Sequence, residues 1–146
     1  GPDLESFADN DTLGLTASEW MNILNGYTKV GYWVVDIATG MVRWSPRTYE
    51  IHGLPYDEGH VPMTEAIKKY HPEDMPILMS LLEQAIESKC GFSFQLRLID
   101  AAGAVKDVAS VAAFKTDDQG EEKLYGIFHE VTPAHKGVPT LHSVAY

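Results

Sequence analysis

The stretch GYWVVDIATGMVRWSP, residues 31–46, contains two apolar runs joined by a short turn with a glycine. β-Branched and aromatic residues dominate residues 30–37, and a second short run covers residues 41–44, so both runs predict β-strands. Residues 38–40, Ala-Thr-Gly, supply the turn. The stretch therefore predicts a β-hairpin.

Helices follow the hairpin. Ser45-Pro46 is typical of a helix start, and we expect a short helix over residues 47–52. Thr64 is expected to cap a second short helix. After the string HPEDM at residues 71–75, apolar residues recur at helical spacing over residues 76–89, which predicts a longer amphipathic helix.

The second half of the chain is typical of β-structure. Residues 92–98 alternate between large apolar and polar side chains, as a strand with one buried face does. Turn residues at 100–103 and 117–120 separate this run from two further strands, expected over 105–114 and 123–131. The order of elements predicts an α+β domain with an antiparallel sheet and helices over one face.

The two ends differ from this central region. Thr16 and Glu19 resemble a capping box in front of an apolar helix face. Pro133 and Gly137 prevent a long helix from continuing out of the last strand. We therefore expect a tag scar and flexible lead over residues 1–15, an amphipathic helix over 16–26, the main domain over 27–132 and an irregular tail over 133–146.

Composition restricts the partners. The chain has 146 residues and a formal charge of −10, so its field repels phosphate backbones and anionic lipids. We expect no nucleic acid and no membrane insertion, since no apolar run approaches the roughly 20 residues that cross a bilayer. Cys90 is the only cysteine, which fits a reducing compartment and a cytoplasmic location.

Four strings in this order resemble a PAS domain of the bacterial sensor type. They are GYWVVDIATGMVRWSPRTYEIHGL at 31–54, HPEDM at 71–75, FSFQLRLIDAAGAVKDV at 92–108 and GIFHEVT at 126–132. The resemblance implies a five-stranded antiparallel sheet in the order 2-1-5-4-3, with short helices over one face. Two departures from the family are Glu130, where the family usually has Asp, and the helix-breaking residues after Thr132.

The resemblance implies a non-enzymatic signalling module in a bacterial regulatory pathway. Such a module senses a small molecule in its core, relays a signal by protein–protein interaction, or does both. Its partners would be a small-molecule ligand, a regulatory protein such as a two-component kinase, and a second copy of the chain. The alternative is a pure dimerisation domain with a filled core and no ligand. We expect no enzyme and no metal site, because the histidines are scattered and no catalytic cluster is visible.

The cofactor is unknown from the sequence. Haem is not expected, because His71 directly precedes Pro72, a place that relatives use to start the long helix. Flavin photochemistry looks contradicted, because Cys90 follows the long helix instead of lying in an Asn-Cys-Arg-Phe-type string ahead of it.

Two sets of residues are candidates for function. One set is expected to point towards the space between sheet and helices, because of its alternation along the strands and its spacing on the helices. These side chains either fill the core or line a pocket. They are Val35, Trp44, Tyr49, Ile67, Leu78, Leu81, Leu82, Phe94, Leu96, Val111 and Phe128. Tyr49, Ser110 and His129 are the polar candidates for such a pocket. The second set is expected on the N-terminal helix, on the outer face of the sheet and at the end of the last strand. These residues either bind a partner or form an ordinary solvated surface. They are Trp20, Ile23, Leu24, Trp33, Arg97, Tyr125, Glu130 and Thr132.

Overall fold

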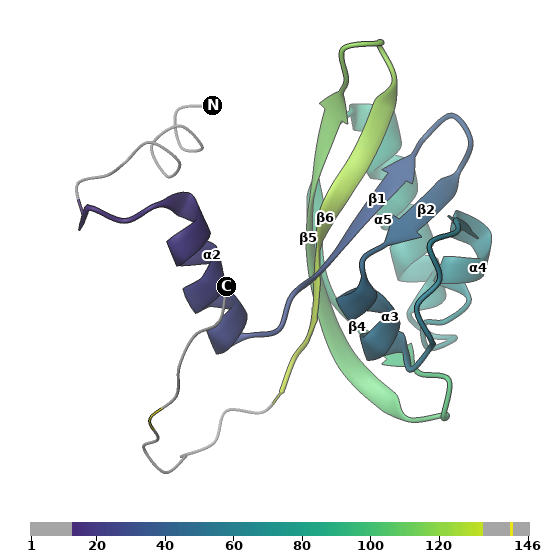
Figure 1. Cartoon of the computed structure of the whole chain (residues 1–146). Helices are drawn as coiled ribbons and strands as arrows, with labels where there is room; N and C mark the ends of the chain where they lie inside the picture. Colours follow the sequence, from purple (N-terminus) through teal and green to yellow (C-terminus); the bar gives the residue numbers. More distant parts are fainter. Residues whose placement is uncertain (1–12, 133–140, 142–146) are drawn as a thin grey trace. The chain divides into compact units, whose positions relative to one another are not determined.

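The computed structural model describes residues 13–132 and residue 141 (Figure 1). The chain divides into two compact units, one of residues 1–29 with 134–146 and the other spanning Val30–Pro133. Most of the expected lead and nearly all of the expected tail lie outside the described residues.

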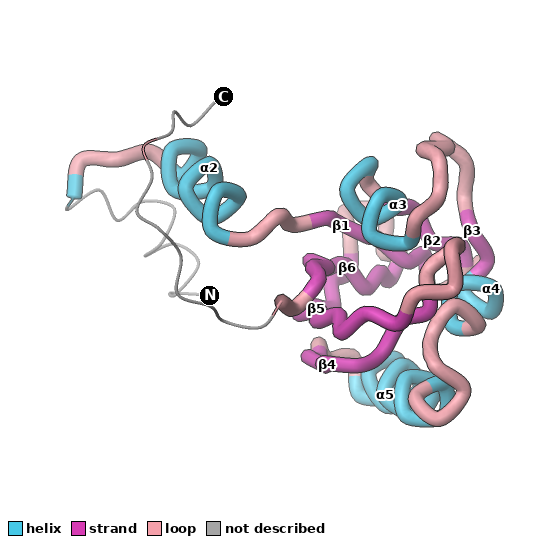
Figure 2. The backbone as a smooth tube through the Cα atoms, turned by 90° about the horizontal axis from the view of Figure 1, so that it is seen from below, coloured by secondary structure: helices cyan, strands magenta, loops and turns pink. Residues whose placement is uncertain are grey.

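The larger unit is built on one antiparallel sheet of six strands in the order β3-β2-β1-β6-β5-β4 (Figure 2). The strands are β1 Gly31–Asp36, β2 Met41–Trp44, β3 Val61–Pro62, β4 Phe92–Ile99, β5 Val105–Thr116 and β6 Glu122–Glu130. The predicted order 2-1-5-4-3 is confirmed. The structure adds one strand, β3, because Val61 and Pro62 pair with the edge of β2.

Three helices cover one face of this sheet: α3 Pro46–His52, α4 Met63–Ile67 and α5 Met75–Ser88 (Figure 1). Gly53 ends α3 with a φ of 73°, a conformation that glycine adopts without strain. Thr64 was expected to cap α4. It lies within the helix instead, because α4 starts directly after Pro62. A proline can end an extended segment and leave the next residue free to start a helix.

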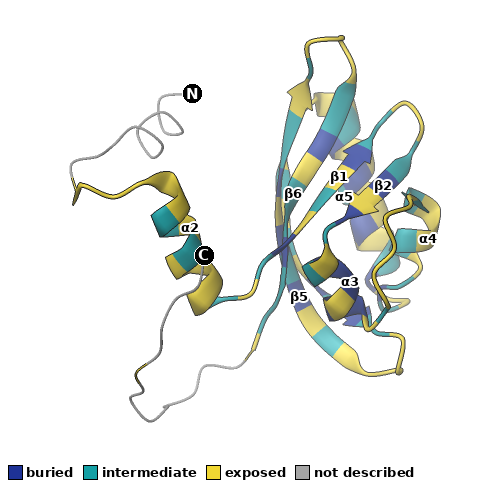
Figure 3. Cartoon of the chain, in the orientation of Figure 1, coloured by how far each residue is buried: buried dark blue, intermediate teal, exposed yellow. Residues whose placement is uncertain are grey.

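The buried residues of the sheet lie on the face that the helices cover (Figure 3). Leu98, Val108 and Leu124 have no exposed surface, and Phe128 is 2% exposed. These side chains form the core together with Leu78 and Leu82 of α5 and residues of α3. Apolar side chains that follow strand and helix periodicity thus produce the two-layer packing.

A hydrogen-bonded ion pair fixes the start of α5 to strand β4. The carboxylate of Asp74 accepts hydrogen bonds from the backbone N–H, Nε and Nη2 of Arg97, at 2.7, 3.1 and 2.8 Å. These bonds to Arg97 lower the pKa of Asp74 to about 2. The neighbouring backbone contributes as well, because the His71 N–H donates to the Arg97 carbonyl and the Ile99 N–H donates to the Lys69 carbonyl. The segment before α5 therefore lies along the edge of β4.

Helix α2, Ala17–Tyr27, belongs to the smaller unit. The predicted capping box is present: the Thr16 hydroxyl accepts from the Glu19 N–H, and the Glu19 carboxylate accepts from the Thr16 N–H. No residue of α2 is buried, and Ile23 and Leu24 are 54% and 46% exposed.

Removing the charge of Asp74 tests the attachment of α5. Asp74→Asn is expected to lower the urea midpoint of unfolding, because the bidentate, charge-assisted contact with Arg97 is lost. Glu73→Gln is the matched control, since Glu73 is exposed and lies 3.5 Å from the same guanidinium group. Because the pKa of Asp74 is lowered from 3.8 to about 2, its contribution is present above pH 3.8 and is lost as the pH falls towards 2. Equal midpoints for the two variants would contradict this role.

Candidate functional site

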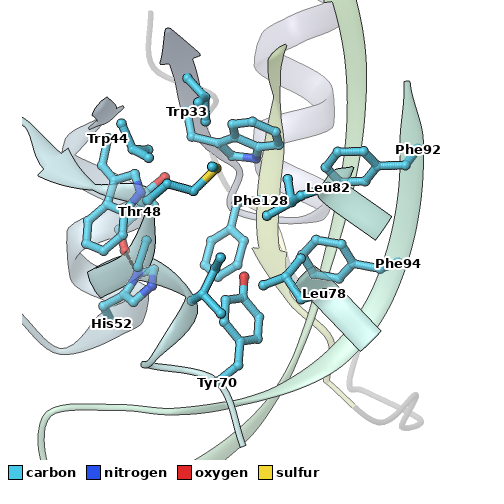
Figure 4. Close-up of a pocket in the computed structure, with 15 residues that line it drawn as sticks. Trp33, Trp44, Thr48, His52, Tyr70, Leu78, Leu82, Phe92, Phe94 and Phe128 are labelled. Atoms are coloured by element: carbon cyan, nitrogen blue, oxygen red, sulfur yellow. Dashed lines mark hydrogen bonds between the residues drawn. The ribbon is translucent and has the colours of Figure 1, made fainter. Parts of the chain in front are cut away.

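A cavity of about 70 Å³ lies between the sheet and the helices (Figure 4). Protein interiors seldom leave space larger than a water molecule, so this space is a distinct feature of the core. The lining consists of Trp33, Val35, Val42, Trp44, Thr48, His52, Met63, Ala66, Ile67, Tyr70, Leu78, Leu82, Phe92, Phe94 and Phe128.

The lining overlaps in part with the predicted set. Seven of the residues expected at the cavity are in the lining, namely Val35, Trp44, Ile67, Leu78, Leu82, Phe94 and Phe128. Tyr49 and Leu96 are buried in the core outside the lining, and Leu81 is partly buried on α5. Tyr49 packs edge-on against the ring of the lining residue Trp44, with the ring centroids 5.1 Å apart.

Two expectations of strand orientation are corrected. Val111 does not face the helices but is 57% exposed on the outer face of the sheet. Its neighbour Ser110 is buried opposite Phe128, and successive side chains of a strand point to opposite faces. Trp33 was expected on the outer face, yet it lines the cavity. It lies two residues from Val35, so the two side chains share a face.

The three predicted polar candidates do not offer free groups to the cavity. The Ser110 hydroxyl donates to the Ile127 carbonyl at 2.6 Å and accepts from Trp33 Nε1 at 3.0 Å, which fixes the indole ring. His129 lies opposite Ala109 and follows Phe128, so its side chain is on the outer face. Neither Ser110, His129 nor Tyr49 belongs to the lining.

The polar residues of the lining are Thr48, His52 and Tyr70, and sequence reasoning missed all three as site residues. Thr48 and His52 are four residues apart on α3, a spacing that places side chains on one helix face and could have indicated them. Phe92 has the parity of Phe94 and carried the same signal. Tyr70 lies between α4 and α5, where no periodic pattern predicts orientation.

His52 is held between two aromatic rings. Its imidazole is stacked on the Trp44 ring at a centroid distance of 4.1 Å and on the Phe128 ring at 5.2 Å, with interplanar angles of 18° in both pairs. Only 3% of its surface is exposed. This packing fixes the plane of the imidazole at the wall of the cavity.

The protonation state of His52 follows from its surroundings. Its pKa is lowered to about 4, mainly by burial; the hydrogen bond to Thr48 opposes the shift, and the positive charges of Lys69 and Lys106 add to it. The ring is therefore neutral at pH 7. Its Nδ1 lies 2.7 Å from the Thr48 carbonyl oxygen, which can only accept, so Nδ1 carries the proton. The other nitrogen, Nε2, is consequently a hydrogen-bond acceptor.

Tyr70 presents a neutral hydroxyl. Burial raises its pKa well above the usual value, and its ring packs edge-on against Phe94 at 5.9 Å. The hydroxyl is directed towards the middle of the lining residues (Figure 4). It has no hydrogen-bond partner among the residues that the structure describes.

Lys106 links the helix that carries His52 to the end of the sheet. Its ammonium group donates to the Ile51 carbonyl at 2.9 Å and lies 3.2 Å from Asp100 Oδ2 and 3.7 Å from Glu130 Oε1. Glu130 is the last residue of β6. One side chain thus bridges the C-terminal turn of α3 and the strand from which the chain leaves the sheet.

The remaining docking candidates lie in separate places. Tyr125 is 41% exposed on the outer face of β6, beside the exposed Val34 of β1. The guanidinium group of Arg97 is bound by Asp74, and 38% of the Arg97 side chain stays exposed. Thr132 is exposed just after β6, and Trp20 lies on α2, which belongs to the smaller unit.

In the described part of the chain, no group of three or more His, Cys, Asp or Glu residues could hold a metal ion. The described helices are also too short or too polar for any of them to span a bilayer.

The larger unit is an α+β domain in which an antiparallel sheet carries short helices on one face, with a cavity between the two layers. A family model described as the PAS fold matches residues 41–128, more than half of the sequence. The chain belongs to the PAS family. The resemblance given by the four strings is therefore confirmed. No curated protein matches the sequence.

Solved structures show the same fold at low sequence identity. The N-terminal domain of a diguanylate cyclase with a PAS/PAC sensor from Marinobacter aquaeolei is 19% identical, with a TM-score of 0.63 over 70% of this chain and 94% of that one. A sensory box histidine kinase/response regulator from Burkholderia thailandensis is 17% identical, with a TM-score of 0.63 over 77% and 84%. These structures are sensor domains of signalling proteins.

Light-oxygen-voltage domains share the fold too. A fungal photoreceptor of this type is 15% identical, with a TM-score of 0.56 over 69% of this chain and 75% of that one, and two further structures of this type match. The expectation that flavin photochemistry is contradicted is therefore wrong. It relied on the place of Cys90 alone, and the position of one exposed cysteine does not exclude a cofactor.

The buried imidazole predicts a dependence of stability on pH. The unfolded chain protonates His52 near pH 6.5, whereas the folded chain does so only near pH 4. Unfolding therefore takes up a proton between these values, and the free energy of unfolding falls as the pH falls from 6.5 to 4, by about 3 kcal/mol in total. Denaturant unfolding at several pH values measures this.

The control is His52→Leu, which keeps the other histidines. Its free energy of unfolding is expected to change less over the same interval, whatever its absolute stability. An identical pH dependence in both proteins would contradict the neutral state of His52.

Proposed function

We propose that this PAS domain is a non-enzymatic sensor that binds a small molecule in the cavity between sheet and helices. One observation carries the proposal: side chains leave a space of about 70 Å³ between the sheet and the helices, although a domain that serves assembly alone has no need of such a space. The lining is mainly apolar with a few polar groups, which is typical of small-molecule sites.

The contacts of α3 support a route from the cavity to the end of the domain. His52 is at the cavity wall, and Lys106 connects the adjacent Ile51 carbonyl to Glu130. A ligand that prefers one packing of α3 on the sheet would shift the population of states in which this bridge is formed. The bridge ends at Glu130, the last residue of β6 and two residues before Thr132, so the change would reach the point where the chain leaves the sheet.

The proposed setting is a bacterial regulatory pathway in the cytoplasm, with a regulatory protein such as a kinase as the partner. The similarity to sensor domains of a histidine kinase and a diguanylate cyclase supports it. The proposed docking elements are α2, through Trp20, Ile23 and Leu24, and the outer sheet face around Tyr125.

The second candidate function is assembly of two copies through the outer sheet face. The observation in its favour is a group of exposed apolar side chains on neighbouring strands, which are Tyr32 and Val34 on β1, Tyr125 on β6 and Val111 on β5. Exposed apolar patches of this kind often mark interfaces. A filled core together with a dimer would favour this function over sensing.

Mass spectrometry of the purified protein separates the two functions. Native spectra of wild-type protein from a bacterial lysate are expected to show an extra mass that denaturation releases. Ala66→Leu places a larger side chain in the cavity lining and is expected to lose this mass. The matched control, Ala113→Leu, makes the same substitution opposite Tyr125 on the outer face and is expected to retain it.

Mass spectra without a bound molecule would contradict ligand sensing. This result is the bare chain mass in the wild type and in both variants. A dimer in the same native spectra that Tyr125→Glu converts to monomer would then establish assembly as the function.

A further inference from the structure

Two polar atoms at the cavity lack a protein partner, and they carry the inference. They are Nε2 of His52 and the hydroxyl oxygen of Tyr70, in residues that are 3% and 8% exposed. Neither atom has a hydrogen-bond partner among the described residues, yet no fully enclosed side-chain N or O atom there lacks one. Both atoms therefore keep some accessible surface, and the Tyr70 hydroxyl points among the lining residues (Figure 4). Each atom can therefore form a hydrogen bond with a molecule that enters the cavity, and a ligand with a matching polar group would gain that bond.

The two atoms differ in the hydrogen bonds that they can form. Nε2 of the neutral His52 accepts a hydrogen bond, because Nδ1 holds the proton and donates it to the Thr48 carbonyl. The ligand must therefore bring an O–H or N–H donor to this point. The Tyr70 hydroxyl can donate or accept, so it can pair with the same polar group of the ligand or with a neighbouring one.

The lining opposes a net charge inside the cavity. None of its residues is an Asp, Glu, Lys or Arg, and its histidine is neutral at pH 7. A charge placed there would lose its hydration without gaining an ionic partner. The nearest cations are outside: Lys68 and Lys69 line a separate hollow of about 280 Å³, which shares the wall formed by His52 and Tyr70.

The shape of the lining favours a flat molecule. Phe92 lies nearly parallel to Trp33, with centroids 6.1 Å apart and an angle of 21°, and nearly parallel to Phe94, at 6.0 Å and 14°. The cavity volume of about 70 Å³ is roughly half of the ~150 Å³ that holds benzene in a protein core. Met63, the one unbranched thioether in the lining, is the side chain best able to move and admit a ring.

We propose that the cavity takes a flat, uncharged ring, free or as part of a larger molecule, whose O–H or N–H group donates to His52 Nε2 and pairs with the Tyr70 hydroxyl. This inference rests on the proposed function and adds the chemical class of the ligand. Phenol has this chemistry. Toluene has the same shape without the polar group, and benzoate adds a charge.

The test is a titration of the ¹⁵N-labelled full chain with these three probes, followed by NMR. The indole signals of Trp33 and Trp44 report on the cavity, and that of Trp20 on α2 serves as the internal reference. Phenol is expected to bind more tightly than toluene and to shift the ¹⁵N signal of His52 Nε2. Benzoate is expected to leave the Trp33 and Trp44 signals unchanged.

Tyr70→Phe isolates the hydroxyl. No protein hydrogen bond is lost in this variant, so it is expected to fold, and its phenol affinity is expected to fall about three- to tenfold while its toluene affinity is kept. Tyr49→Phe is the matched control, because Tyr49 is buried outside the lining, and it should bind phenol as the wild type does. The same titrations in Met63→Ala, which enlarges the cavity, keep the test valid if the wild-type cavity is too narrow for a ring.

The outcomes separate the two proposals. Toluene binding without a phenol preference, in both the wild type and Met63→Ala, would overturn the ligand class and leave cavity sensing intact. Benzoate binding as tightly as phenol would show that a charge reaches Lys68 or Lys69 and would overturn the uncharged class. If none of the three probes binds in either background, the inference is overturned. The proposed function is tested separately, by the extra mass that denaturation releases in mass spectrometry.

Discussion

The hydrogen-bonded ion pair between Asp74 and Arg97 is the constraint on which the rest of the domain depends. It joins Asp74, the residue before α5, to Arg97 of the edge strand β4, which lies 23 residues further along the chain, so the helix starts at a fixed point on the sheet edge. Because Asp74 also accepts from the Arg97 backbone, the pair fixes the strand and not only a side chain. The place of Leu78 and Leu82 above the sheet follows from this attachment.

The cavity is a consequence of attachment at both sides of the layer. On one side Asp74 holds α5 against β4, and on the other Lys106 holds the end of α3 towards Glu130. Between these points the helices rest on large aromatic side chains, which pack well in pairs but do not fill every space. His52 follows Ile51, whose carbonyl accepts from Lys106, and it lines the cavity. A change of packing at this residue therefore bears directly on the bridge to the end of the sheet.

Local patterns in the sequence were sufficient for the longer strands of the sheet but not for their order. The alternation over residues 92–98 and the hairpin at residues 31–44 fixed which strands exist, and the resemblance to PAS domains supplied their order. The short strand β3 was missed, because two residues in a loop carry no periodic signal. The orientation of Trp33 was predictable from its parity with Val35, whereas the face of Val111 needed the register between β5 and β6.

The polar part of the site was beyond such patterns. Tyr70 lies in an irregular segment whose position is set by backbone hydrogen bonds to β4, and the orientation of the His52 ring depends on stacking between residues of α3, β2 and β6.

The most direct measurement is a crystal structure of the protein as purified from its host. The account predicts density for a bound molecule next to the Tyr70 hydroxyl and His52. A cavity closed by the side chains of Trp33 and Met63, with the Tyr70 hydroxyl bonded to the protein, would contradict it.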